Sequence, residues 1–175
     1  VRILVADKLP DSHVSDLGRR HQVTVLDRGT DMVEAVAGHE VLVVRSTKVK
    51  AETIDAAADL ALVIRAGAGV NTIDWRAAAN RGIYVCNTPG KNAVAVAELT
   101  MGLITAIDRR IPDAVADLRS GRWRKKEYGK AHGLAGRTLG IIGFGDIGTE
   151  VAIRAAAFEM RLVVEERPGR SPRQL

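Results

Sequence analysis

The sequence predicts an α/β protein in which parallel strands are covered by helices on both faces. Three observations support this fold class: short apolar runs alternate with helical segments, 46% of the residues are hydrophobic, and only 3% are aromatic. A core built mainly from Ala, Val, Leu and Ile suits a parallel sheet that is buried on both sides. The chain has 175 residues, which leaves room for one domain and part of a second.

Five strands are expected in the first half of the chain. The third is the clearest, because residues 41–44 form the continuous aliphatic and β-branched run typical of a strand buried on both faces. Alternation of strands with helices along the chain predicts a doubly wound parallel sheet. The expected strands are 3–6, 23–26, 41–44, 62–65 and 83–86, with helices over 33–37, 51–58 and 73–79 and a helix start at 10–12.

The pattern changes after Pro89 and Gly90. Residues 92–111 form one long helical segment that is apolar around most of its circumference. Such a helix requires burial between domains or against another subunit, so we expect a homodimer formed through this helix and the second domain. Pro112 is expected to break or kink this helix, and a further helix is expected over 113–120.

A nucleotide-binding pattern follows in the second half of the chain. Gly143, Gly145 and Gly148 form the sequence G-x-G-x-x-G between an expected strand at 139–142 and an expected helix at 147–158. The first glycine permits a tight turn, the second lets the backbone approach a pyrophosphate, and the third lets the helix pack closely on the strand. Unpaired N–H groups at the helix start then face the phosphates. The alternative is a glycine-rich turn that binds no ligand.

An acidic residue is expected about 20 residues beyond these glycines, where it would bind the ribose hydroxyls of a dinucleotide. Glu166 lies near this spacing, and Glu165 is its neighbour. A carboxylate at this point favours NAD over NADP because it repels a 2′-phosphate. The last strand is expected over 161–164, and the Arg- and Pro-rich residues 167–175 are expected to form a disordered tail.

Charge and composition limit the partners. The net charge is +5, and much of the excess lies in residues 119–130. This basic stretch is either a solvated loop or anion-binding rim, or a nucleic-acid footprint; no nucleic-acid motif accompanies it, so no nucleic-acid partner is expected. The single cysteine, Cys86, excludes an internal disulfide and fits a reducing, cytoplasmic location. No apolar run is long enough for a membrane span, and no metal site is expected.

Three motifs in succession carry a resemblance to a known family. RAGAGVNTID, VCNTPGKNAVAVAEL and LAGRTLGIIGFGDIG resemble segments of the D-isomer-specific 2-hydroxyacid dehydrogenases, and the resemblance runs from about residue 3 to residue 166. Members of that family have a flavodoxin-like domain that helps to hold substrate and a Rossmann domain inserted into it. The resemblance implies a flavodoxin-like substrate domain over 1–90, followed over 91–166 by a connecting helix and an incomplete Rossmann NAD-binding domain.

The resemblance also assigns binding residues. Arg45 and Ser46 would contact the carboxylate or phosphate of the substrate, since an arginine fork suits both groups. The turn at 67–69 would lie beside substrate and nicotinamide, with Ala68 contacting both. The implied substrate residues are Arg45, Ser46, Gly67, Ala68, Gly69 and Asn92, and the implied cofactor residues are Ala68, Gly143, Gly145, Asp146, Ile147, Gly148 and Glu166.

Simpler alternatives exist for several of these residues. Arg45 alternatively caps a strand end, and Asn92 is also well placed as a helix N-cap. Trp123, Arg124 and Lys125 lie in a segment near the family's cleft and would supply positive charge to a phosphorylated substrate. The alternative is that Trp123 only packs and that the basic residues are only solvated.

The activity implied by the resemblance is NAD-dependent oxidation of the CH–OH group of a D-2-hydroxy acid. Similarity is greatest to the branch that oxidises 3-phospho-D-glycerate in serine biosynthesis. The family's catalytic Arg, His and acidic residue lie beyond the end of this chain, and none of the four histidines matches that His, so we predict no catalytic residue and no turnover by the chain alone. The alternatives are a non-catalytic homologue that binds NAD or a partner, or a fragment without activity.

Overall fold

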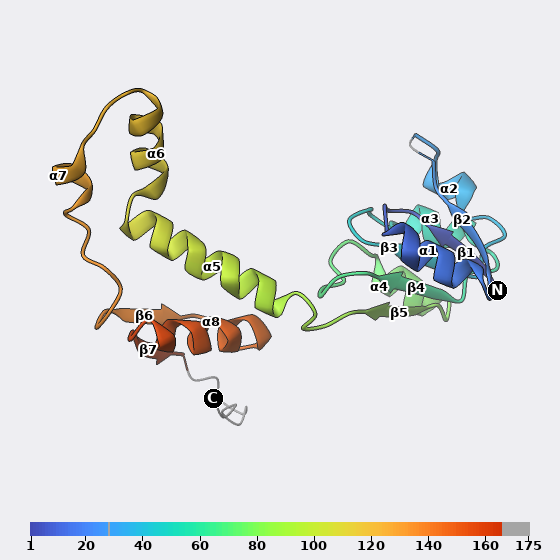
Figure 1. The fold of residues 1–175 in the computed structure, drawn as a ribbon. Helices are drawn as coiled ribbons and strands as arrows, with labels where there is room; N and C mark the ends of the chain where they lie inside the picture. Colours follow the sequence, from blue (N-terminus) through green and yellow to red (C-terminus); the bar gives the residue numbers. More distant parts are fainter. Residues whose placement is uncertain (28, 166–175) are drawn as a thin grey trace. The chain divides into compact units, whose positions relative to one another are not determined.

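The computed structural model describes residues 1–27 and 29–165. The chain divides into two compact units, Val1–Lys91 and Asn92–Leu175 (Figure 1). Glu166 and the tail expected over 167–175 lie outside the described residues.

The first unit is built on a parallel sheet. Its strands are β1 (Arg2–Val5), β2 (Gln22–Val25), β3 (Val41–Val44), β4 (Leu62–Arg65) and β5 (Tyr84–Asn87). All pairings are parallel, and the strand order is β2-β1-β3-β4-β5. This is the flavodoxin-like order of doubly wound sheets, so the predicted α/β class and the flavodoxin-like sheet are confirmed.

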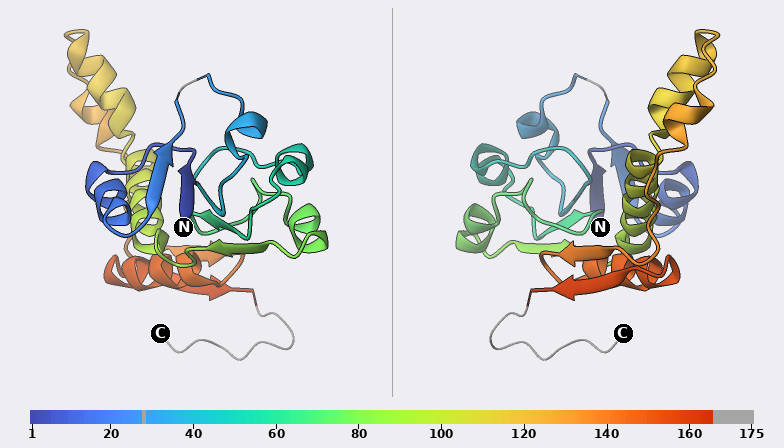
Figure 2. Two further views of the ribbon diagram at one scale, coloured as in Figure 1. Left: turned by 90° about the vertical axis from the view of Figure 1, so that its right-hand side faces the viewer. Right: turned by 90° about the vertical axis from the view of Figure 1, so that its left-hand side faces the viewer.

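Helices cover both faces of this sheet (Figure 2). One face is covered by α1 (Asp11–Gly18), and the other by α2 (Met32–Ala35), α3 (Ala51–Ala56) and α4 (Trp75–Asn80). Successive side chains of a strand point to opposite faces, so neighbouring residues of one strand enter different cores. Leu4, for example, packs in the larger core on the α2–α4 side, whereas Ile3 packs in the smaller core with Leu17 of α1.

Two aspartates fix where the short helices of this unit begin. The Asp31 carboxylate accepts a hydrogen bond of 2.9 Å from the N–H of Val33 at the start of α2. The Asp74 carboxylate accepts one of 3.0 Å from the N–H of Ala77 at the start of α4. Both are N-caps, which satisfy N–H groups that have no partner within the helix.

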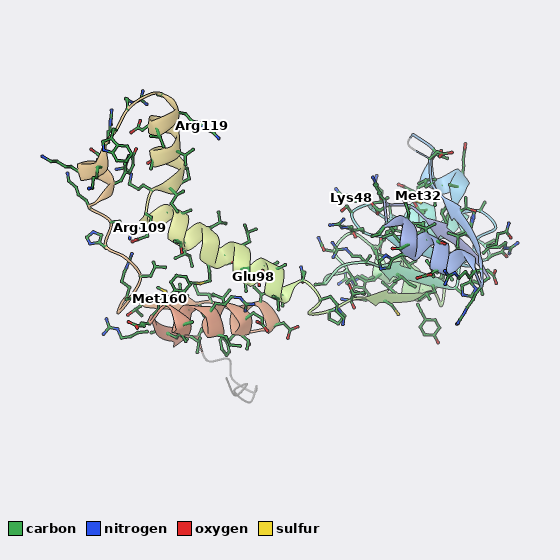
Figure 3. All side chains as sticks on the ribbon, viewed as in Figure 1. Met32, Lys48, Glu98, Arg109, Arg119 and Met160 are labelled. Atoms are coloured by element: carbon green, nitrogen blue, oxygen red, sulfur yellow. The ribbon has the colours of Figure 1, made fainter. Side chains whose placement is uncertain are left out.

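The second unit has a long helix packed on a strand–helix–strand segment. It contains α5 (Ala93–Asp108), α6 (Ile111–Arg119), α7 (Lys125–Tyr128), β6 (Thr138–Ile141), α8 (Asp146–Ala157) and β7 (Arg161–Val164). Strands β6 and β7 pair in parallel. Helices α5 and α8 lie side by side, with Ala97 and Met101 buried against Val151 and Ala155. Glu98, labelled on α5 in Figure 3, lies 3.5 Å from the Arg154 guanidinium on α8.

The prediction of one continuous helix over 92–111 is wrong at its end. Helix α5 ends at Asp108, and Arg110 has a left-handed backbone with φ of 50°. Pro112 does not break a helix here. It lies in the first turn of α6, where its missing N–H costs no hydrogen bond.

Within the described chain, side chains on one face of this helix are buried. Ala93, Ala97 and Met101 are buried, whereas the apolar side chains on the remaining surface of α5 are exposed: Val94, Leu99, Leu103 and Ile107. The described part of the unit therefore leaves an apolar stripe uncovered. Within residues 1–27 and 29–165, none of the helices combines the length and apolar character needed to cross a bilayer.

The turn after α8 contains a residue in an unfavourable backbone conformation. Glu159 has φ of 59°, a left-handed conformation that residues other than glycine rarely adopt. The Glu159 N–H donates to Ala156 and the Met160 N–H to Ala155, at 2.9 and 3.1 Å. This is the Schellman arrangement, whose left-handed position normally carries glycine because a Cβ is strained there.

We expect Glu159→Gly to stabilise the second unit by about 1 kcal/mol, because it removes the Cβ from a left-handed position. Glu159→Ala is the matched control. It keeps the Cβ and is expected to leave stability nearly unchanged. Urea unfolding combined with hydrogen exchange at the α8 amides measures both effects, and equal stabilities of the Gly and Ala variants would contradict the strain.

Candidate functional site

The carboxyl edge of the first sheet brings several loops together. In open α/β sheets, ligands bind outside the carboxyl ends of the strands, near the point where the strand order reverses. Here that point lies between β1 and β3. Asp7 follows β1, and the predicted substrate residues Arg45 and Ser46 follow β3.

Asp7 holds the loop that follows β3. Its Oδ2 atom accepts hydrogen bonds from the backbone N–H groups of Arg45, Ser46 and Thr47, at 2.6, 3.1 and 3.0 Å. Partial burial raises the pKa of Asp7, but these backbone donors together lower it further, so the net pKa lies below its ordinary value. Sequence reasoning missed Asp7; its signal is an acidic residue directly beyond the carboxyl end of a buried strand.

The side chain of Arg45 remains available. Its backbone N–H, not its guanidinium, makes the strand-end contact with Asp7. Within the described chain, no acidic group pairs with this guanidinium, and Arg45 and Ser46 are both exposed. The alternative of a strand-end cap therefore accounts for the backbone of Arg45 but not for its side chain.

The turn at 67–69 has its carbonyl groups tied into the protein. The Gly67 oxygen accepts from the Thr88 N–H at 3.0 Å. The Ala68 oxygen accepts from Asn87 Nδ2, and the Gly69 oxygen accepts from a nitrogen of Arg65, both at 2.7 Å.

Two N–H groups of the same turn are not bonded in this way. Among the described residues, no group accepts a hydrogen bond from the N–H of Ala68 or Gly69. Successive free N–H groups form a concave site for an anion. The Gly67 N–H donates to the Arg65 oxygen at 2.8 Å, so of the three implied substrate residues only Ala68 and Gly69 leave N–H groups for a carboxylate or phosphate. Their role as substrate contacts stays a prediction.

Asn92 lies at the N-cap position of α5, with φ of −104°, and its side chain makes no capping hydrogen bond. The simple capping alternative is therefore not supported, and its role as a substrate contact stays a prediction.

The second unit contains the glycine-rich turn between β6 and α8. Gly143 has φ of 93°, a conformation that side-chain-bearing residues rarely adopt. Gly148 is buried on the first turn of α8, and a Cβ built on it would lie 2.6 Å from the Gly143 oxygen and 3.3 Å from the Ile141 side chain. The helix can approach the strand only because residue 148 has no side chain.

Gly145 faces open space instead. It is the N-cap residue of α8, and a Cβ built on it would meet no atom within 4 Å. Helix α8 is 12 residues long, so its dipole favours an anion at this end. Asp146 and Ile147 are the first two residues of the helix. The turn thus fits a dinucleotide diphosphate, because it packs tightly on the protein at Gly148 and leaves open space at Gly145.

The basic stretch is partly neutralised within its own unit. Asp117 accepts hydrogen bonds from Tyr128 and Arg122, and it forms an ion pair with Arg124 at 3.5 Å. The bonds from Tyr128 and then Arg122 lower the pKa of Asp117, and in return Asp117 raises the pKa of Tyr128. Trp123 is 76% exposed, so the alternative that it only packs is not supported by this unit.

No histidine or metal centre supplies an obvious catalytic group. His13 lies in α1, and His39 is within hydrogen-bond distance of the Thr24 hydroxyl. His21 and His132 lie in connecting segments. Over residues 1–27 and 29–165, no three His, Cys, Asp or Glu side chains gather to hold a metal ion.

An anion-receiving edge on a flavodoxin-like sheet, together with a G-x-G-x-x-G turn in a second α/β unit, is typical of dehydrogenases that use a nicotinamide dinucleotide. Comparison with known proteins specifies the family. Residues 3–166 match the model of the D-isomer specific 2-hydroxyacid dehydrogenase catalytic domain, and the chain belongs to this family.

Two similar proteins illustrate the match. The D-3-phosphoglycerate dehydrogenase of Methanocaldococcus jannaschii is 43% identical over 166 residues, which are 93% of this chain and 32% of that protein. The hydroxypyruvate reductase of Thermotoga maritima is 48% identical over 134 residues, which are 76% of this chain and 44% of that protein. The chain therefore spans less than half the length of either relative.

A solved structure shows the same fold. The NAD-dependent formate dehydrogenase of Staphylococcus aureus, in complex with NAD, aligns with a TM-score of 0.83 and 27% identity. The alignment covers 94% of this chain and 56% of that one.

Replacing Asp7 by Asn tests the anchored loop. At pH 7 we expect Asp7→Asn to lower the free energy of unfolding by about 1–3 kcal/mol, because a carboxylate accepts hydrogen bonds more strongly than an amide. Since the folded pKa of Asp7 is lowered, this stability is present above the unfolded pKa of about 3.9 and is lost as the pH falls through the folded pKa.

The measurement is urea unfolding of both proteins between pH 7 and pH 2. The difference between wild type and Asp7→Asn is expected to shrink below about pH 4, because the unfolded chain then binds a proton that the folded chain does not, and to vanish below the folded pKa, where the carboxyl group is protonated in both states. A difference that stays constant over this range would contradict the assigned role of the charge.

Proposed function

We propose that this chain binds NAD at the turn between β6 and α8 and an anionic D-2-hydroxy acid at the carboxyl edge of the first sheet. In the protein as a whole, this pair of sites serves NAD-dependent oxidation of the CH–OH group of the acid. The observation that carries the proposal is the turn itself. A Cβ at Gly148 would meet the Gly143 oxygen at 2.6 Å, whereas one at Gly145 would meet nothing within 4 Å.

The cofactor residues act mainly through their backbone. The N–H groups at the start of α8, at Asp146, Ile147 and Gly148, would bind the diphosphate, and Gly145 allows its close approach. Glu166 would accept hydrogen bonds from the ribose hydroxyls, and Ala68 would contact the nicotinamide. When bound, NAD supplies the hydride acceptor, and the residues of this chain hold and orient it.

The substrate residues combine one charged side chain with backbone N–H groups. The exposed guanidinium of Arg45 can bind a carboxylate or phosphate through two parallel hydrogen bonds. The free N–H groups of Ala68 and Gly69 suit a second acidic group, and Ser46 and Asn92 would complete the contacts. Two anionic groups on one small acid describe 3-phospho-D-glycerate, and the similarity to the enzyme from Methanocaldococcus jannaschii supports it.

We expect Gly145→Ala to weaken NADH binding at least 10-fold, because its methyl group would occupy the space left for the diphosphate. Stability should be unchanged, since a Cβ there meets no protein atom within 4 Å. Gly18→Ala in the first unit also has open space and serves as the control, with unaltered affinity. NADH fluorescence titration measures the affinity, and equal binding by both variants would refute the cofactor site.

The same samples address turnover. None of the four histidines matches the family's acid–base residue. The 175 residues alone should therefore bind NADH, but should not oxidise 3-phospho-D-glycerate when NAD is supplied. NADH formation at an ordinary enzymatic rate would contradict this. The second candidate function, a non-catalytic NAD-binding homologue, also predicts that NADH binds. It is favoured only if the complete protein lacks turnover as well.

A second copy of the chain is the proposed partner. The uncovered stripe of α5 includes Leu99, Leu103 and Ile107, with exposed fractions of 63, 54 and 76%, and contiguous apolar surface of this kind marks an interface. We expect Leu103→Lys to weaken self-association at least 10-fold in sedimentation velocity. Val25→Lys, at an exposed apolar position of β2 in the first unit, is the control, and equal effects of both changes would exclude α5 as the interface.

A further inference from the structure

We propose that Arg65 is a positioning residue, which together with Asp7 fixes the spacing of the two loops that form the anion site of the first unit. This inference rests on the proposed binding of an anionic hydroxy acid at the carboxyl edge of the first sheet. The two loops are the 45–47 loop after β3 and the 67–69 turn after β4.

Arg65 joins the loops directly. It is the last residue of β4, and its Nε atom donates to the Arg45 oxygen at 3.2 Å. Its Nη1 atom donates to the Gly69 oxygen at 2.7 Å. One rigid guanidinium therefore bonds to the backbone of both loops.

The glycines of the turn lie against this guanidinium. A Cβ built on Gly67 would be 3.2 Å from Arg65 Cζ, and one built on Gly69 would be 3.2 Å from Arg65 Nη1. Both spacings are tighter than ordinary contact. The absence of side chains at these positions thus lets the turn pack on the arginine plane, with its free N–H groups directed elsewhere.

The Arg45 residue is held at both of its backbone polar groups. Its N–H donates to the Asp7 carboxylate at 2.6 Å, and its oxygen accepts from Arg65. Opposite charges thus hold one residue from two directions, and charge-assisted hydrogen bonds are the stronger kind. The rotation of the Arg45 backbone that would swing its side chain away is opposed at each end.

A second connection lies further along the same loops. The Val49 N–H donates to the Thr72 oxygen, and the Asp74 N–H donates to the Val49 oxygen, both at 2.8 Å. The loops are therefore joined at Arg65 and again at Val49. The Arg45 side chain and the free N–H groups of the turn belong to backbone restrained in this way, which lowers the entropy lost when an anion is bound.

Arginine is required for this role because of its shape. The planar fork presents donors in fixed directions and can reach two carbonyl oxygens at once, whereas lysine carries one compact charge on a flexible stem. Arg65→Lys keeps the charge near the site but cannot maintain both bonds. The change therefore separates positioning from simple electrostatic attraction.

The experiment is a titration of the full 175-residue chain, labelled with nitrogen-15, with 3-phospho-D-glycerate. In the wild type, the Ala68 and Gly69 amide resonances should move on addition of the acid. In Arg65→Lys the same resonances should differ before any acid is added. The acid concentration at half-saturation should rise at least 10-fold. Arg81→Lys is the matched control, because Arg81 donates to the Ile54 oxygen of the same unit, away from both loops. It should titrate as the wild type does.

Gly67→Ala gives an independent perturbation, since its Cβ presses on the guanidinium without removing it. It should also raise the acid concentration at half-saturation. Wild-type affinity in both Arg65→Lys and Gly67→Ala, or unfolding of Arg65→Lys with wild-type affinity in Gly67→Ala, would overturn the positioning role. If the wild type itself shows no response at Ala68 and Gly69, the anion site of the proposed function fails.

Discussion

The parallel pairing of β1, β3, β4 and β5 is the constraint on which the first unit depends. Because all four strands run in one direction, their carboxyl ends emerge at one edge, and the loops that follow them become neighbours. Asp7, Arg45 and Arg65, which are far apart in the sequence, are thereby brought within hydrogen-bond distance of one another's loops. The direction of the strands therefore determines where the candidate anion site lies, and the side chains then determine its chemistry.

The second unit depends on a different constraint, the close approach of α8 to β6. The approach is set by Gly148, and it places the start of the helix directly behind the turn that contains Gly143. Packing of α5 on α8, through Ala97, Met101, Val151 and Ala155, supports the helix from its other side. The tight turn at Gly143 and the open space at Gly145 therefore serve one arrangement, in which backbone N–H groups face outward from a well-supported helix.

Sequence patterns were informative where local chemistry decides the structure. Continuous apolar runs located β3, β4 and β7 to the residue, and the glycine spacing located the turn before α8, because each depends on neighbours in the chain.

Long-range contacts explain what the sequence did not reveal. The role of Asp7 depends on N–H groups nearly 40 residues away, and that of Arg65 on which carbonyl oxygens the folded sheet places beside it. The predicted end of α5 is wrong because the helix does not depend on Pro112 for its break. Arg110 adopts the left-handed conformation two residues earlier and pairs with Asp113 and Glu127, and no periodicity predicts such pairs.

The orientation of the 67–69 turn has a wider consequence. Its three carbonyl groups point into the protein, so the positive ends of its peptide dipoles are presented outward with no charged side chain in the turn. An affinity for anions that comes from peptide N–H groups cannot be inferred from the number of Lys and Arg residues. It also persists when the side chain at Ala68 changes, so this surface can diverge in sequence among related proteins and keep its electrostatic character.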